Sequence, residues 1–178
     1  NASLDAVKAV LKRFKVGFAP ESSKFLFNAV KSERFERETY EKSGLFGGSS
    51  SDFYDRFRSR IMFPIWNTSS KVVGFGGRVF ASDDPAKYMN SPETPLYKKS
   101  DIFYGLHSAR ESIREKKYAI LVEGYTDIIK LYQSGVHNCV AVSGTAFSDR
   151  HASQMKRFCS RVLLAYDGDT AGGAAALK

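Results

Sequence analysis

The sequence predicts a mixed α/β fold, in which an α+β N-terminal part with antiparallel strands is followed by a parallel βαβαβ sheet. Hydrophobic residues make up 43% of the 178 residues, enough to build a core of ordinary size. In the first part, apolar residues recur at helical spacing, and the period then changes to that of strands. In the last third, short apolar strands alternate with helices, as in parallel strands joined by right-handed crossovers.

Three helices are expected within residues 1–46, ahead of a polar break at residues 47–51. Apolar residues between Leu4 and Phe14 share one helical face, and Gly44 is well placed to cap the last helix. The Gly- and Ser-rich break is the most flexible point that the composition indicates and a candidate joint between subdomains. The three helices are predicted at residues 4–14, 24–30 and 33–42.

A basic segment with antiparallel strands is expected over residues 52–100. Residues 61–65 and 72–80 are rich in branched and aromatic side chains, and turn-forming residues lie between them, which predicts a β-hairpin. The proline-containing stretch 83–101 has little periodicity, so we expect an ordered loop there.

The last third is expected to form the parallel sheet. Ser108 and Glu111 match a capping box, which predicts that a helix begins there and runs to about residue 117. Gly135 is placed to end the helix that follows the first strand. Strands are predicted at residues 118–122, 138–142 and 162–166, with helices at 125–134 and 148–158, and a Gly- and Ala-rich helix start after the last strand.

The charge of the chain favours a polyanionic partner. There are 27 Lys and Arg residues against 19 Asp and Glu, a formal net charge of +8. A membrane partner is not expected, because no apolar run approaches the ~20 residues of a spanning helix. Cys139 and Cys159 form neither a disulfide framework nor a zinc pattern, so we expect no structural zinc and a reducing, cytoplasmic location.

Carboxylates follow two of the three predicted parallel strands. Glu123 comes directly after one strand, and Asp167 and Asp169 come after another, each next to a glycine. If the strands are neighbours, the three acids meet at one rim, where a divalent cation such as Mg²⁺ or Mn²⁺ would offset their repulsion. The alternative is that they cap helix N-termini. Asp127, one helical turn beyond Glu123, fits either interpretation.

The segment from Arg56 to Lys99 carries eight basic residues and three acids, with aromatic residues interleaved. If residues 56–60 are extended, Arg56, Arg58 and Arg60 project from one face at a spacing suited to successive phosphates. Phe57, Phe75, Tyr88 and Tyr97 would then be candidates for stacking on bases. The alternative is a solvated basic face with the aromatic residues in the core. These patterns indicate metal-dependent phosphoryl transfer beside a basic groove, without separating polymerase from nuclease or topoisomerase.

Several strings of the sequence, taken in order, resemble the catalytic core of bacterial DnaG-type DNA primases, whose metal-binding half is a toprim domain. The strings are FPI at 63–65, GFGGR at 74–78, KYMNSPETPL at 87–96, YGL at 104–106, VEGYTD at 122–127, SGTA at 143–146 and YDGDTAG at 166–172. The resemblance implies a DNA-dependent RNA polymerase that makes short RNA primers on single-stranded DNA from nucleoside triphosphates. It also implies that the reaction is nucleotidyl transfer assisted by a divalent metal. The implied location is the bacterial cytoplasm, at the nucleoid and replisome. Replicative helicase and single-strand-binding protein are the implied partners of the full-length protein.

The resemblance also assigns roles to individual residues. Glu123 resembles the toprim glutamate, Asp167 and Asp169 the metal-binding DxD pair, and Asp127 a further acid of the catalytic site. His151 and Ser143 lie in family-like strings, but we interpret them as helix-start and packing residues. The positions that match the family's nucleic-acid- and nucleotide-binding ridge are Arg60, Arg78, Lys87, Tyr88, Asn90 and Lys99.

The resemblance divides the chain at residues 1–116 and 117–178, and it has departures. Trp66 and Asn67 replace a basic–acidic pair at the hairpin, and Thr126 stands where Met is usual. The family's zinc-binding and helicase-interaction modules are not found, and we expect the toprim domain to be truncated at its C-terminal end. Two alternatives follow: a catalytically incomplete fragment that only binds single-stranded DNA, or a toprim nuclease or topoisomerase.

Overall fold

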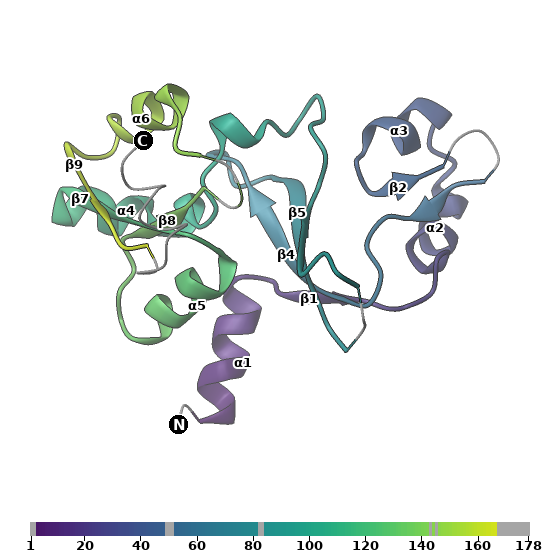
Figure 1. Ribbon diagram of the computed structural model, residues 1–178, viewed down its shortest axis with the longest axis horizontal. Helices are drawn as coiled ribbons and strands as arrows, with labels where there is room; N and C mark the ends of the chain where they lie inside the picture. Colours follow the sequence, from purple (N-terminus) through teal and green to yellow (C-terminus); the bar gives the residue numbers. More distant parts are fainter. Residues whose placement is uncertain (1–2, 49–51, 82–83, 143, 145, 167–178) are drawn as a thin grey trace.

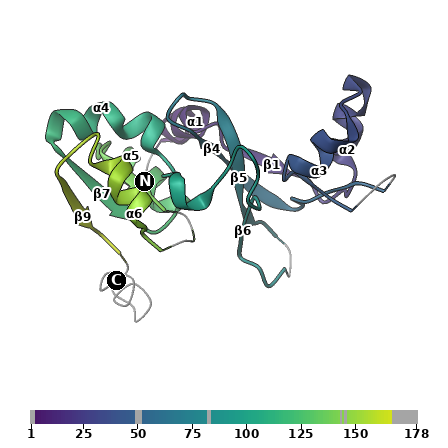
Figure 2. The ribbon, with the colours of Figure 1, turned by 90° about the horizontal axis from the view of Figure 1, so that it is seen from above.

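The structure is a computed structural model that describes residues 3–48, 52–81, 84–142, 144 and 146–166. Figure 1 shows three groups of elements: a parallel sheet with its helices, a central antiparallel sheet, and small helices with a two-stranded ribbon. Seen from above, the central sheet lies between the other two groups (Figure 2). The predicted mixed α/β fold, with antiparallel strands first and parallel strands last, is confirmed.

The first predicted helix is present as α1 (Leu4–Arg13). The Ser3 Oγ accepts a hydrogen bond from the Ala6 amide at 3.2 Å, which satisfies one of the free N–H groups of the first turn. Phe14, directly after the helix, is buried, and its ring packs edge-on against Tyr132 of α5 (Tyr125–Gln133), with 5.3 Å between centroids. The apolar face of α1 therefore attaches the N-terminus to the parallel-sheet group.

The other N-terminal helices are shorter than predicted. Helix α2 (Phe25–Val30) begins near the expected residue, and Asp55 accepts hydrogen bonds from the Leu26 and Phe27 amides at its N-terminus. The predicted helix over residues 33–42 is interrupted, because Arg34 adopts a left-handed φ of 51° after the short helix η1 (Lys31–Glu33). Only α3 (Arg37–Lys42) remains of it, and Gly44, with φ of 71°, follows its end as expected.

An aromatic cluster forms the core of this small group. Rings of Phe27, Tyr40, Phe46 and Phe53 lie with centroids 5.5 to 6.5 Å apart. Phe46 belongs to β2 (Phe46–Gly47), which pairs with β3 (Tyr54–Asp55). The predicted break at residues 47–51 thus begins inside a strand, and residues 49–51 lie outside the described part of the chain.

The central sheet has the strand order β1-β4-β5-β6, and all its pairs are antiparallel. The predicted hairpin is confirmed as β4 (Arg60–Trp66) and β5 (Val72–Val79), and the Asn67 Oδ1 accepts from the Ser69 and Lys71 amides in the turn. Two edge strands were missed, because three residues are too few to show a periodicity and pairing alone orders them. They are β1 (Gly17–Ala19), which lies between the first two predicted helices, and β6 (Tyr88–Asn90), expected as a loop.

The parallel sheet follows the predicted rhythm with the strand order β8-β7-β9. Helix α4, which precedes it, begins at Leu106 and not at the predicted capping box. Gly105 is its N-cap, with φ of 83°, and Ser108 lies within the first turn. Burial of Leu106 and Ala109 determines this start, since both side chains face the sheet. The elements are α4 (Leu106–Lys116), β7 (Tyr118–Val122), α5 (Tyr125–Gln133), β8 (Cys139–Ala141), α6 (Asp149–Met155) and β9 (Arg161–Leu164).

Tyr125, the first residue of α5, joins the two sheets. Its buried ring stacks on Phe63 of β4 at 5.0 Å and packs edge-on against Tyr104 at 4.6 Å. The Tyr125 hydroxyl donates to the Asn90 Oδ1 of β6 at 2.6 Å. A Cβ at Gly76 would lie 2.3 Å from the Tyr125 Cζ, so only glycine leaves room for this ring. The Gly-rich string of β5 thus leaves room for a side chain of α5.

The histidine of α4 predicts a dependence of stability on acidity. His107 stacks on Trp66 at 5.1 Å, and burial, with Arg13 and Arg110 nearby, lowers its pKa from 6.5 to about 4. The unfolded chain therefore binds more protons between these values, and the free energy of unfolding falls as the pH drops from 6.5 towards 4. Because the ring is partly exposed, we expect His107 to contribute about 1 kcal/mol of this loss.

Urea denaturation at a series of pH values measures this effect. His107→Phe keeps a ring against Trp66 and removes the titration, so its stability should fall less steeply with acidity than that of the unmodified chain. His151, whose pKa burial also lowers, retains its own share of the dependence in both proteins. Identical pH profiles for the two proteins would show that His107 does not titrate as described.

Within the described part of the chain, none of the helices is long and apolar enough to cross a membrane.

Candidate metal and nucleic-acid site

The parallel strands β7 and β9 end side by side at the position where the sequence predicts the acidic rim. The Ala165 amide donates to the Leu121 carbonyl at 2.8 Å, which confirms that the two strands are neighbours. Glu123 follows β7 directly and is exposed. The pKa of Tyr166, just past β9, is raised by burial and further by the charge of Glu123, so the two residues are close enough to interact electrostatically. The structure therefore places Glu123 at the predicted rim.

Asp127 caps the helix that leaves this rim. Its Oδ2 accepts a hydrogen bond from the Gly124 amide at 3.0 Å, across the first turn of α5. The sequence left open whether Asp127 binds metal or stabilises the helix start. The structure shows the hydrogen bond of the second role, and metal binding by Asp127 stays a prediction. A carboxylate bound in this way still keeps lone pairs for a cation.

The other predicted metal ligands, Asp167 and Asp169, lie outside the described residues. Within the described residues, no three side chains of His, Cys, Asp or Glu cluster closely enough to hold a metal ion. Glu123 is therefore the one predicted ligand of the DxD–Glu set whose position can be described. Residues 123–127 and 165–166 contain oxygen donors and no His or Cys, a donor set that fits Mg²⁺ or Mn²⁺ better than Zn²⁺.

The predicted ridge residues Arg78, Tyr88 and Asn90 lie on adjacent strands of the central sheet. Arg78 pairs with Tyr88 across β5 and β6, and Asn90 pairs with Gly76 two residues along. Tyr88 is 42% exposed, and its ring lies 6.4 Å from that of Tyr125. Through Tyr125, which follows Glu123 by two residues, the ridge lies against the start of α5. The structure thus places these three residues on the face of the central sheet against which Tyr125 packs.

Arg60 has a different environment from the rest of the ridge. It is 1% exposed, pairs with Asp84, and donates to the Ala86 carbonyl at 2.9 Å. The prediction of three arginines on one extended face is wrong, because Ser59 has a positive φ of 48° and the strand begins only at Arg60. Arg56 and Arg58 instead line a cavity of about 320 Å³ beside this ion pair. Arg60 therefore holds the segment before Lys87 against the sheet, and Lys87 itself is exposed.

The aromatic residues of the basic segment divide between core and surface. Phe57 and Tyr97 are buried, so the prediction that they stack on bases is wrong for both. Their rings fill the space left by two glycines of β5: Tyr97 lies against Gly74, and Phe57 against Gly77. Tyr88 remains available at the surface.

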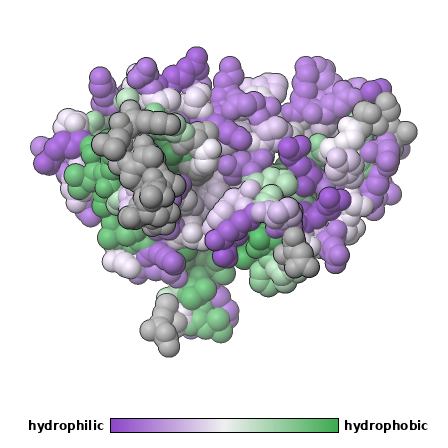
Figure 3. All heavy atoms as spheres, viewed as in Figure 1, coloured by the Kyte–Doolittle hydropathy of each residue, from purple (hydrophilic) through white to green (hydrophobic). Residues whose placement is uncertain are grey.

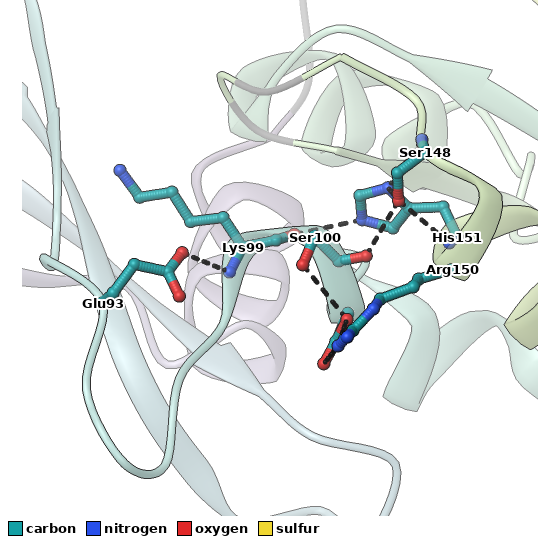
Figure 4. Close-up of polar contacts among 7 residues, drawn as sticks. Glu93, Lys99, Ser100, Ser148, Arg150 and His151 are labelled. Carbon is teal, nitrogen blue, oxygen red and sulfur yellow. Dashed lines mark hydrogen bonds and ion pairs between the residues drawn. The ribbon is translucent and has the colours of Figure 1, made fainter.

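Lys99 is positioned by a hydrogen-bond network that the sequence did not reveal (Figure 4). Its amide donates to the Glu93 Oε1 at 2.9 Å, and its carbonyl accepts from the Nε2 of buried His151 at 3.1 Å. The Ser148 amide donates to the His151 Nδ1, and the Ser148 hydroxyl donates to the Ser100 carbonyl at 3.0 Å. The predicted role of His151 at a helix start is confirmed, since Ser148 caps α6.

This network leaves the ammonium group of Lys99 available. In Figure 4 its side chain points away from His151 and Arg150. None of the ion pairs formed between described residues involves Arg78, Lys87 or Lys99. Burial lowers the pKa of His151, so the ring stays neutral and keeps its Nδ1 as an acceptor. Residues 99 and 151 are far apart in sequence, and for that reason periodicity and local motifs could not find their contact.

Comparison with known proteins relates the chain to DNA primases. Residues 3–110 match the family model of the DNA primase catalytic core, N-terminal domain, and residues 117–178 match the toprim domain. A DNA primase from Staphylococcus aureus is 41% identical over 172 residues, which cover 96% of this chain and 28% of the relative. The chain therefore spans less than a third of the length of this curated relative.

Solved structures give the same result. The RNA polymerase domain of Mycobacterium tuberculosis primase DnaG superposes with a TM-score of 0.88 at 39% identity, over 96% of this chain and 58% of that one. A DnaG primase catalytic domain bound to single-stranded DNA superposes with a TM-score of 0.83 at 38% identity, over 96% of this chain and 53% of that one. Sequence and three-dimensional structure together show that the chain belongs to the family of DnaG-type DNA primase catalytic cores.

Proposed function

We propose that the chain carries the catalytic core of a DNA primase, which synthesises short RNA primers on a single-stranded DNA template from nucleoside triphosphates. The observation that carries the proposal is the joint at Tyr125. Its 2.6 Å hydrogen bond to Asn90 links the ridge to the helix that starts at the Glu123 rim. A site for phosphate chemistry and a cationic surface for nucleic acid are thereby held together. The ligand in the DNA-bound relative supports the same substrate class.

The reaction is attack of the primer 3′-hydroxyl on the α-phosphate of a nucleoside triphosphate, which forms a phosphodiester bond and releases pyrophosphate. A divalent cation, when bound, would lower the pKa of the hydroxyl and offset charge on the departing phosphates. Glu123, with Asp167 and Asp169, would hold Mg²⁺ or Mn²⁺. Asp127 orients the Gly124 turn beside them.

The cationic residues act on template and nucleotide. Arg78, Lys87 and Lys99 have no carboxylate partner among the described residues, so their charge is available for phosphates. Tyr88, exposed next to Arg78, offers a ring to a base, and Asn90 holds the ridge against Tyr125. Arg60 acts indirectly, through Asp84, on the segment that carries Lys87.

The cellular setting follows from this role. We assign the chain to the bacterial cytoplasm, where the longer protein would work with the replicative helicase and single-strand-binding protein. Residues 1–116 would form the primase-specific unit and 117–178 the toprim unit, a division that the ranges of the two family matches support.

Binding of single-stranded DNA at several salt concentrations tests the ridge. Arg78→Ala and Lys99→Ala should each weaken binding and reduce the slope of log K against log salt by about one unit, because each removes roughly one phosphate contact. Fluorescence anisotropy with a labelled oligonucleotide measures both quantities. Lys8→Ala, on the exposed face of α1, removes the same charge and is the matched control.

The slopes decide between a binding ridge and a solvated basic face. Equal slopes for all three variants would show that Arg78 and Lys99 belong to a solvated basic face and do not contact phosphates. Cleavage of the oligonucleotide in Mg²⁺, without synthesis of RNA when nucleoside triphosphates are added, would contradict primer synthesis and favour a toprim nuclease.

A further inference from the structure

Two exposed phenylalanines form a pair at one end of the central sheet. Phe18 of β1 is 57% exposed and Phe80, directly after β5, is 53% exposed. Their rings meet edge to face, with centroids 5.7 Å apart and an angle of 85° between the planes. Figure 3 shows a green, hydrophobic patch over β1 and the end of β5, beside purple, hydrophilic surface. Exposure of two large apolar rings costs solvation free energy, which a ligand would recover.

Strand register places this pair in line with the ridge. Phe18 pairs with Ile61, Ile61 with Arg78, and Arg78 with Tyr88, so one row crosses all four strands. Side chains of directly paired residues share a face of the sheet, and Phe80, two residues after Arg78, lies on that face too. Gly76, two residues before Arg78, is where Tyr125 packs. The row therefore runs across the face that contacts the toprim helix.

Three of the four positions in the row, all except Ile61, carry side chains that suit a nucleic-acid strand. Tyr88 is an exposed ring, and Arg78 has a buried Nε without a hydrogen-bond partner among the described residues. Ile61 follows and packs against the core, and the phenylalanine pair lies beyond it. With ~4.8 Å between strands, the row is ~14 Å long, which corresponds to about four stacked nucleotides at ~3.4 Å each. A cation that binds phosphate, with rings that stack on bases on either side of it, supplies the elements of a single-strand binding track.

We propose that Phe18 and Phe80 form a base-stacking site for single-stranded nucleic acid at the end of this row away from Tyr88. The inference rests on the proposed function and extends it. It adds to the cationic ridge an apolar contact for the bound nucleic-acid strand, which the charge pattern of the sequence does not reveal. The phosphate contacts of Arg78 would position the strand, and the two rings would hold its bases without selecting a sequence.

Binding of an oligothymidine of roughly 12 nucleotides to the whole 178-residue chain tests the proposal. Phe18→Ala and Phe80→Ala should each weaken binding about 5- to 100-fold, with the salt slope unchanged because no phosphate contact is lost. Phe80→Trp, which keeps an aromatic surface, should bind within about 3-fold of the unmodified chain. Phe35→Ala removes a ring that is 49% exposed in the small helical group, and it is the matched control with no expected effect.

An oligonucleotide in which abasic sites replace four central bases separates stacking from other causes. If the rings stack on bases, the loss caused by Phe80→Ala should be smaller with the abasic strand than with the intact one. Equal losses with both strands, or unchanged affinity in both alanine variants, would overturn the proposal. The proposed function would still stand if Arg78→Ala weakened binding in the same experiment, and it would fail separately if the unmodified chain did not bind single strands.

Discussion

Glu123→Gln should reduce template-dependent primer synthesis at least about 100-fold while single-stranded DNA binding stays unchanged. Glu123 lies where β7 and β9 end, and its proposed role is to bind a divalent cation. It has no proposed contact with the DNA strand. The amide of glutamine keeps the size of the side chain and removes the charge that offsets dehydration of Mg²⁺. Synthesis of labelled RNA on an oligonucleotide template measures the effect.

Two further measurements make this result specific. Glu115→Gln, on the exposed side of α4, removes the same charge far from the rim and should leave synthesis intact. Titration with Mn²⁺ should show weaker Mn²⁺ binding by Glu123→Gln than by the unmodified chain, and unchanged binding by Glu115→Gln. This titration does not depend on activity. Near-normal synthesis in Mg²⁺ by Glu123→Gln would remove Glu123 from the metal site.

Gly76→Ala should lower the free energy of unfolding by about 2–3 kcal/mol, because the added methyl group overlaps a buried ring. The new Cβ would lie 2.3 Å from the Tyr125 Cζ and 2.5 Å from its hydroxyl oxygen. Tyr125 stacks on Phe63 and contacts Tyr104, so its ring cannot move aside without disturbing the core between the sheets. Urea denaturation followed by circular dichroism measures the loss.

The matched control lies in the same sheet. Gly17→Ala in β1 places its Cβ 4.0 Å from the nearest side-chain atom, at Met62, and should be neutral or slightly stabilising. If Gly76→Ala were as stable as Gly17→Ala, the close approach of Tyr125 would not be the reason for a glycine at this position. A further consequence of displacing Tyr125 is loss of its bond to Asn90, so DNA affinity of Gly76→Ala should fall as well.

The elements predicted best are those whose own residues carry the signal. Strand β7 was predicted at the observed bounds, and α5 ends before Gly135, whose φ of 81° suits a glycine stop. The β4–β5 hairpin followed from branched residues on both sides of the turn at Asn67. In these segments local propensity, periodicity and turn chemistry all favour the same secondary structure, and tertiary packing favours it too.

The elements predicted worst depend on partners distant in sequence. Strand β6 exists because Arg78 and Gly76 pair with it, and helix α4 starts at Leu106 because burial outweighs the capping pattern at Ser108. The same limit applied to the site. Arg60 and Arg78 look alike in the sequence, yet one is buried in an ion pair with Asp84 and the other lies on the ridge.

The sequence by itself determined the α/β class, the order of most elements, the family and the carboxylate after β7, since each depends on residues that are close together in the chain. Only the tertiary structure decided which side chains reach the surface: strand pairing aligned Phe18, Arg78 and Tyr88 in one row. It also placed His151 within hydrogen-bond distance of the Lys99 carbonyl and packed the ring of Tyr125 against Gly76. Such contacts join segments from different parts of the chain, and a one-dimensional pattern does not record which distant residues a fold places side by side.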